Sequence, residues 1–210
     1  ACAPRTNDVF APDEDAALLL HRQALTGIFG RGLAHDVNNK LVSLLGYVDF
    51  ALSQKDPALY EKTLRKNLES STRIAQNVRA FQHANSLFDV SRAGMDAGEL
   101  LKDACACLQY YCLQKNLTVQ LENLAALPLN GPAGVCFQLL AGILHAIISD
   151  VAEFSTLAIA TTPTGAVAFA LSKPMAGWPG HNFHWTVLAR LAEKIDAKIS
   201  YHEETPGAVV

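Results

Sequence analysis

Three polar residues in one short segment carry groups that could handle a phosphoryl group: His35, Asp36 and Asn39. An imidazole nitrogen is a nucleophile that can carry a phosphoryl group covalently, and a neighbouring carboxylate can orient the ring or accept its proton. Asn39 follows His35 by four residues, which in a helix places both on one face. The segment therefore predicts a phosphoryl acceptor at His35, with Asp36 and Asn39 beside it.

The residues around His35 have the spacing of a long helix. Apolar residues recur at steps of three and four through residues 25–51, which is typical of a helix with one buried stripe. His35 lies two positions from both Leu33 and Val37, so at roughly 100° per residue it points about 200° away from each. We expect the imidazole on the solvent side of the helix, where another protein could reach it.

A second helix is expected after Pro57, a residue that suits a first helical turn. Its apolar residues again step by three and four, from Tyr60 to Phe81. Residues 12–84 therefore predict an antiparallel helical hairpin, preceded by a tail at residues 1–11. Two long helices cannot bury both apolar stripes in one pair, so we expect a homodimer that forms a four-helix bundle.

The polar side of the second helix is basic. Such a row has two interpretations, a solvated face or a docking face for an acidic partner, and the sequence alone leaves both open. The docking interpretation assigns the partner-binding role to Lys62, Arg65, Lys66 and Arg73.

Residues 88–210 have a different pattern, with helices mixed among short β-rich segments. A two-layer α/β sandwich is the architecture that such a mixture predicts. We expect helices at about 96–115, 133–151 and 184–195, and strands at about 117–121, 156–161, 167–171 and 198–202, with a further strand opening at 207.

Composition narrows the classes of function. The net charge of −3 gives no sign of nucleic-acid binding, and the longest apolar run, 139–148, is too short to span a bilayer. Five cysteines without a zinc-type spacing indicate small buried side chains in a reducing compartment. We therefore expect a cytoplasmic protein without a membrane segment.

The segment His35-Asp36-Val37-Asn38-Asn39-Lys40-Leu41 resembles the phosphoacceptor motif of two-component sensor histidine kinases, with Lys40 where the family usually has proline. The resemblance extends to the helical hairpin and to the order of elements after it. It implies that residues 88–210 correspond to the ATP-binding domain of a kinase. In related kinases, the amide at the position of Asn39 positions water for dephosphorylation of the regulator, so Asp36 and Asn39 could support such a phosphatase activity.

The second domain departs from the kinase pattern at three places. The helix at 138–148 has no asparagine to help hold Mg²⁺, the stretch 171–177 has no aspartate for adenine, and no glycine-rich lid precedes the last long helix. Phosphoryl transfer from ATP depends on positioning and on charge neutralisation by Mg²⁺. We therefore expect a degenerate domain that binds no ATP and no metal.

The combined expectation is a histidine phosphotransfer protein of a phosphorelay. It would exchange a phosphoryl group between His35 and an aspartate of a response-regulator receiver domain, which would supply Mg²⁺. Two alternatives stay open: a divergent or truncated sensor kinase that uses ATP, and a non-enzymatic dimeric scaffold.

Overall fold

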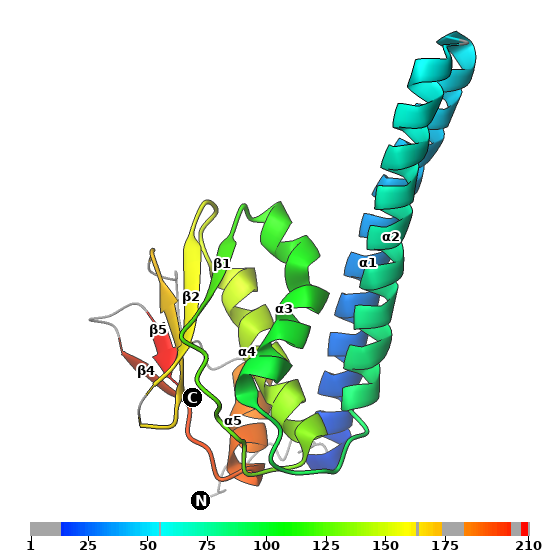
Figure 1. Ribbon diagram of the computed structural model, residues 1–210. Coiled ribbons are helices and arrows are strands. Elements are labelled where there is room, and N and C mark those ends of the chain that lie inside the picture. Colours follow the sequence, from blue (N-terminus) through cyan, green and yellow to red (C-terminus); the bar gives the residue numbers. More distant parts are fainter. Residues whose placement is uncertain (1–13, 55, 163, 174–182, 203–206, 210) are drawn as a thin grey trace, which may run out of the picture.

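The computed structural model describes residues 14–54, 56–162, 164–173, 183–202 and 207–209. Two long helices, α1 (Glu14–Gln54) and α2 (Pro57–Leu87), form an antiparallel hairpin whose far end extends well beyond the rest of the protein (Figure 1). An α/β part follows and packs beside the base of the hairpin. The predicted fold class, a helical hairpin followed by a two-layer α/β part, is confirmed, and α2 ends three residues later than predicted.

The turn between the two helices is encoded locally. Asp56 has an extended backbone and its carboxylate accepts a hydrogen bond from the N–H of Ala58 at 2.9 Å, while Pro57 occupies the first turn of α2. An N-terminal cap of this kind satisfies a backbone donor that has no partner inside the helix, and proline fits where no N–H is needed. The chain therefore reverses over very few residues.

The α/β part contains a five-stranded sheet with the strand order β1-β2-β3-β5-β4. Strands β1 and β2 are parallel, and the other neighbours are antiparallel. Its helices lie on the side of the sheet that faces the hairpin (Figure 1). The elements are α3 (Ala97–Gln114), β1 (Thr118–Glu122), α4 (Ala133–Asp150), β2 (Thr156–Thr161), β3 (Val167–Leu171), α5 (Phe183–Lys194), β4 (Ser200–His202) and β5 (Gly207–Val209).

Helix α4 forms the centre of the core. It is long and apolar enough to cross a membrane by those two criteria, but 78% of the apolar window is buried inside the protein. It packs between α3 and α5, and Leu140, Ile143 and Leu144 are inaccessible to solvent or nearly so. Its burial is that of a core helix.

The base of the hairpin belongs to the same core. Leu25 and Phe29 of α1 are buried in one cluster with residues of α2, α3, α4 and the sheet. The ring of Phe29 stacks on Phe88 with centroids 6.4 Å apart, and Phe88 meets Phe137 of α4 edge-on at 5.1 Å. The hairpin and the α/β part are therefore joined by a continuous apolar interior.

The far half of the hairpin exposes large apolar side chains. Leu45 is 70% exposed and Leu68 is 71% exposed. Each has at least one other exposed apolar residue three or four positions away on the same helix. On α2, Leu64 lies two positions from Lys62 and from Lys66, so it points about 200° away from that basic row. We call this surface the distal apolar face; it consists of Leu41, Leu45, Val48 and Leu52 of α1 with Tyr60, Leu64 and Leu68 of α2.

Candidate functional site

His35 lies on the exposed surface of α1, beside the α/β part. Nδ1 of His35 and Nδ2 of Asn39 are 3.0 Å apart, one helical turn along α1. The ring also packs against the ring of Tyr110 on α3, with centroids 4.5 Å apart and planes tilted by 42°. Among the described residues, Nε2 of His35 has no hydrogen-bond partner.

The approach of α3 to α1 depends on Gly32, one turn before His35. A β-carbon at this position would lie 3.3 Å from Cβ of Tyr110 and 3.3 Å from Cε2 of Tyr111. The hydroxyl of Tyr111 donates to the backbone carbonyl of Ile28 at 3.0 Å. Burial raises the pKa of Tyr111, which keeps that hydroxyl protonated and able to donate. The glycine and the tyrosine pair therefore place α3 directly beside the histidine.

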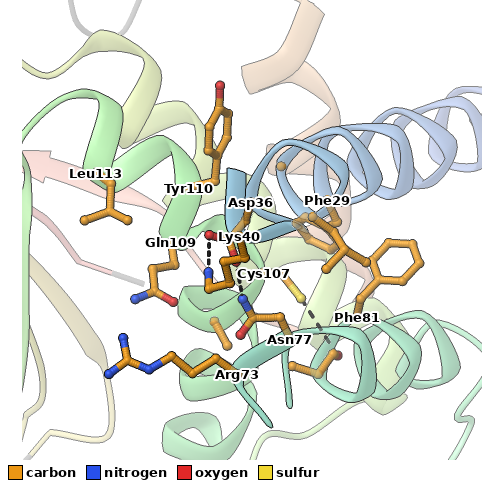
Figure 2. Close-up of a pocket in the computed structure, with 14 residues that line it drawn as sticks. Phe29, Asp36, Lys40, Arg73, Asn77, Phe81, Cys107, Gln109, Tyr110 and Leu113 are labelled. Carbon is orange, nitrogen blue, oxygen red and sulfur yellow. Dashed lines mark hydrogen bonds and ion pairs between the residues drawn. The ribbon is translucent and has the colours of Figure 1, made fainter. Parts of the chain in front are cut away.

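Asp36 lies on the other side of the contact between α1 and α3, away from His35 and toward α2. Its carboxylate accepts hydrogen bonds from Lys40 of α1 and from Asn77 of α2 (Figure 2). These residues line a cavity of about 180 Å³ between α1, α2 and α3, which also receives Arg73 and Tyr110. The carboxylate is thus occupied at the interface between the two helices of the hairpin.

Adjacent residues of a helix point roughly 100° apart. Gly32 lies on the side of α1 that meets α3. His35 and Asp36 point to opposite sides of the direction in which Gly32 faces. The three predicted site residues therefore separate into two groups: His35 with Asn39, and Asp36 with Lys40 and Asn77. The bonds of Asp36 suit a residue that holds α1 in place against α2.

The predicted docking residues lie along one exposed side of α2. Arg65 forms an ion pair with Glu61 at 2.7 Å, and Arg73 forms one with Glu69 at 2.8 Å. Exposed pairs one helical turn apart contribute only a few tenths of a kcal/mol, so these guanidinium groups can exchange partners at small cost. Lys66 differs, because its ammonium lies 4.5 Å from the ring centroid of Tyr47.

The interface between α4 and α5 is tightly filled near Gly142. A β-carbon on Gly142 would lie 2.6 Å from Cδ2 of Leu188 on α5 and 2.9 Å from Cε1 of His21 on α1. His21 is buried, and its Nδ1 lies 3.1 Å from Nε2 of Gln138, which also donates to the carbonyl of Leu18 at 2.9 Å. The first turns of α1 therefore close the space between these two helices.

The cysteines of α3 are poor nucleophiles. Burial raises the pKa of Cys105 and of Cys107 to about 12 and that of Cys112 to about 11. Because the thiolate is the reactive form, such thiols stay protonated and inert at neutral pH. The prediction of small buried side chains is confirmed for Cys112, and Cys105 and Cys107 are partly buried.

Two residues of the site were not among the site residues predicted from the sequence. Asn77 lies on α2 and Tyr110 on α3, so both reach α1 only through tertiary packing. The sequence holds a weak signal for the second, because glycine at position 32 within a helix is unfavourable unless a neighbour approaches closely.

No protein-family model and no curated protein matches the sequence. Among solved structures, the chain is similar to the Acinetobacter baumannii histidine kinase AdeS, with 13% identity and a TM-score of 0.47 over 83% of this chain and 94% of that one. It is also similar to a bacterial phosphotransferase solved at 1.7 Å, with 14% identity and a TM-score of 0.45 over 89% and 94% of the two chains. A histidine kinase from Burkholderia phymatum STM815 aligns with 14% identity and a TM-score of 0.44, over 84% and 95%. At this level of identity and TM-score, the similarity does not assign a function to this chain.

Proposed function

We propose that the chain is a histidine phosphotransfer protein of a two-component phosphorelay. His35 exchanges a phosphoryl group with an aspartate of a response-regulator receiver domain, and the chain itself binds no ATP. The observation that carries this proposal is the exposed imidazole of His35, held at Nδ1 by Asn39 and open at Nε2 among the described residues.

The reaction forms one bond and breaks one. Nε2 of His35 attacks the phosphorus of an aspartyl phosphate, the bond between phosphorus and the acyl oxygen breaks, and the partner's carboxylate leaves. The reverse transfer regenerates the aspartyl phosphate. The Mg²⁺ that neutralises the phosphoryl oxygens belongs to the receiver domain, whose acidic oxygen ligands suit that ion.

The orientation of the Asn39 amide determines which tautomer the neutral His35 ring adopts. With Nδ2 toward the ring, the amide donates to Nδ1, and the proton of the neutral imidazole sits on Nε2. With Oδ1 toward the ring, the amide accepts Nδ1–H and leaves the lone pair of Nε2 free for attack. A half-turn of the amide interconverts the two arrangements, which differ only in the placement of its oxygen and nitrogen.

Asp36 has a supporting part in this proposal. Its carboxylate is engaged by Lys40 and Asn77, so it fixes α1 against α2 at the level of the acceptor. We propose this role in place of proton transfer or dephosphorylation of the regulator. We assign Asp36 to the positioning of the helix.

Two features support the absence of ATP chemistry. The sequence lacks the asparagine, aspartate and glycine-rich lid of kinases, and the space between α4 and α5 is filled by His21 and Leu188 against Gly142. The alternative of a divergent sensor kinase needs a nucleotide at that place.

The proposal includes a homodimer and a cytoplasmic location. A second copy seated on the distal apolar face would complete a four-helix bundle and cover Leu45, Leu64 and Leu68. The basic row on the opposite side of α2 would then stay free for the acidic receiver domain, with Lys62, Arg65, Lys66 and Arg73 as docking residues.

The test is transfer of label from a receiver domain phosphorylated by ³²P-acetyl phosphate in the presence of Mg²⁺. The wild-type chain should gain acid-labile label, and His35→Gln should gain none while keeping its circular dichroism spectrum. No label on the wild-type chain with any of a panel of receiver domains overturns the proposal. Titration calorimetry with Mg-ATP provides the second arm, since micromolar binding would favour the kinase alternative.

A further inference from the structure

We propose that Tyr110 is a positioning residue for phosphoryl transfer at His35. Its ring holds the imidazole against α3, so that the α/β part acts directly on the acceptor nitrogen. This inference rests on the proposed function, because it concerns the same histidine. It assigns the second domain a role in the chemistry in addition to support and docking.

The contact that carries this inference crosses between the two parts of the protein. The ring centroids of His35 and Tyr110 are 4.5 Å apart, within the range of packed aromatic pairs. Most exposed helical side chains rotate freely among rotamers, and fixing one costs entropy. Here one face of the imidazole is covered by Tyr110 and Nδ1 is held by Asn39, while Nε2 is not engaged by any described residue.

Tyr110 is itself held from three sides. Tyr111 packs edge-on against its ring, with centroids 5.0 Å apart and planes at 74°. Nε2 of Gln114 donates to the Tyr110 hydroxyl, and Gly32 of α1 admits the Cβ of Tyr110 to close range. The ring therefore has a fixed place relative to α1, which is a requirement for a group that orients another side chain.

The packing of Tyr110 on His35 limits the orientations of Nε2, the attacking atom. Transfer is fast only when the nucleophile already occupies the geometry of attack, and loosening that geometry lowers the rate. Removing the ring would leave His35 attached to α1 with Asn39 as its one described partner. The number of orientations of Nε2 would increase, and fewer of them would face an incoming phosphoryl group.

Phosphoramidate tests this inference without any protein partner. Nε2 attacks its phosphorus, the phosphorus–nitrogen bond breaks, and ammonia leaves and takes up the proton that Nδ1 of the phosphorylated ring releases. We expect Tyr110→Leu to reduce the rate of His35 phosphorylation by about threefold to tenfold, and Tyr110→Phe, which keeps the ring and loses the hydroxyl, to restore most of it. Equal rates for the wild type and Tyr110→Leu would overturn the inference.

Long-range ¹H–¹⁵N spectra of His35 provide a readout that general loss of structure would not mimic. The ring protons of His35 should lose their upfield shift in Tyr110→Leu and keep it in Tyr110→Phe. If Tyr110→Leu fails to fold, Gly32→Ala moves the tyrosine without changing either ring, and it should slow the labelling in the same direction. A wild-type chain that accepts phosphoramidate but no receiver phosphoryl would overturn the proposed function and leave the positioning role standing.

Discussion

Asn77 of α2 donates a hydrogen bond to the carboxylate of Asp36 on α1, across 41 positions of sequence. The same carboxylate accepts from Lys40, so one acidic group joins two turns of α1 to the facing helix. Asp36 directly follows the proposed acceptor. The register of the hairpin is therefore fixed directly beside His35.

Asn77→Ala should destabilise the protein by about 1–2 kcal/mol, because the half-buried carboxylate of Asp36 loses a donor that water only partly replaces. Urea unfolding followed by circular dichroism measures the change. Gln76→Ala, at an exposed neighbouring position, is the control and should have little effect. Equal stabilities for the two variants would show that the bond contributes nothing.

Gly142→Ala should destabilise the protein by about 1–3 kcal/mol, since its β-carbon would press on Leu188 and His21 in a filled interior. Gly27→Ala, in the middle of α1 with no atom within 4 Å of the added carbon, should stabilise by about 0.5–1 kcal/mol. Thermal unfolding of both variants provides the comparison. A stabilised Gly142→Ala variant would mean that space remains between α4 and α5.

Alkaline pH should weaken the fold through the cysteines of α3. Burial raises the pKa of Cys105 from its ordinary 9.0 to about 12, so above pH 9 the unfolded chain releases a proton that the folded chain keeps. Each such thiol lowers the free energy of unfolding by about 1.4 kcal/mol per pH unit between the two pKa values. Cys105→Ala should flatten this dependence between pH 9 and 11, and both proteins should behave alike below pH 8. A dependence in the variant as steep as that of the wild type would contradict the assignment.

Reversal of the basic row should impair docking and leave the acceptor intact. The quadruple variant Lys62→Glu, Arg65→Glu, Lys66→Glu and Arg73→Glu should take phosphoryl from a receiver domain at least about tenfold more slowly at low salt. The difference should shrink as salt screens the charges. Labelling by phosphoramidate, which needs no docking, separates this loss from damage at His35. A transfer rate that is independent of both charge and salt would favour a merely solvated face.

Charges on the distal apolar face should separate a dimer into monomers. Leu45→Lys combined with Leu64→Lys places two ammonium groups on surface that a second copy would bury, which is costly without partners. Light scattering should give half the wild-type mass. Lys62→Glu on the other side of α2 should leave the mass unchanged, and a monomeric wild-type chain would refute the dimer.

The hairpin and most of the later elements were predictable because each follows a local rule. Pro57 opens α2, and steps of three and four marked both long helices. The hairpin between β2 and β3 follows from Gly165, whose φ of +82° few other residues adopt at low cost. Only Asp56, which caps α2, and the true end of α2 at Leu87 were missed in that region.

The site was predictable only in part, because half of it is assembled from other helices. The spacing of His35 and Asn39 along α1 is visible in the sequence, and the contact between them follows from that spacing. The bond between Asp36 and Asn77, and the packing of Tyr110 on His35, depend on where α2 and α3 meet α1. No periodicity within one helix carries that information.

The shared interior has a consequence for how the chain could be divided. Leu25 and Phe29 of α1 are buried among residues that follow the hairpin, including Phe137. A fragment cut after Leu87 would uncover that surface and would lose the ring beside His35. The hairpin therefore cannot be exchanged by itself, and an engineered chimera that exchanges it must carry a matching α/β part with it.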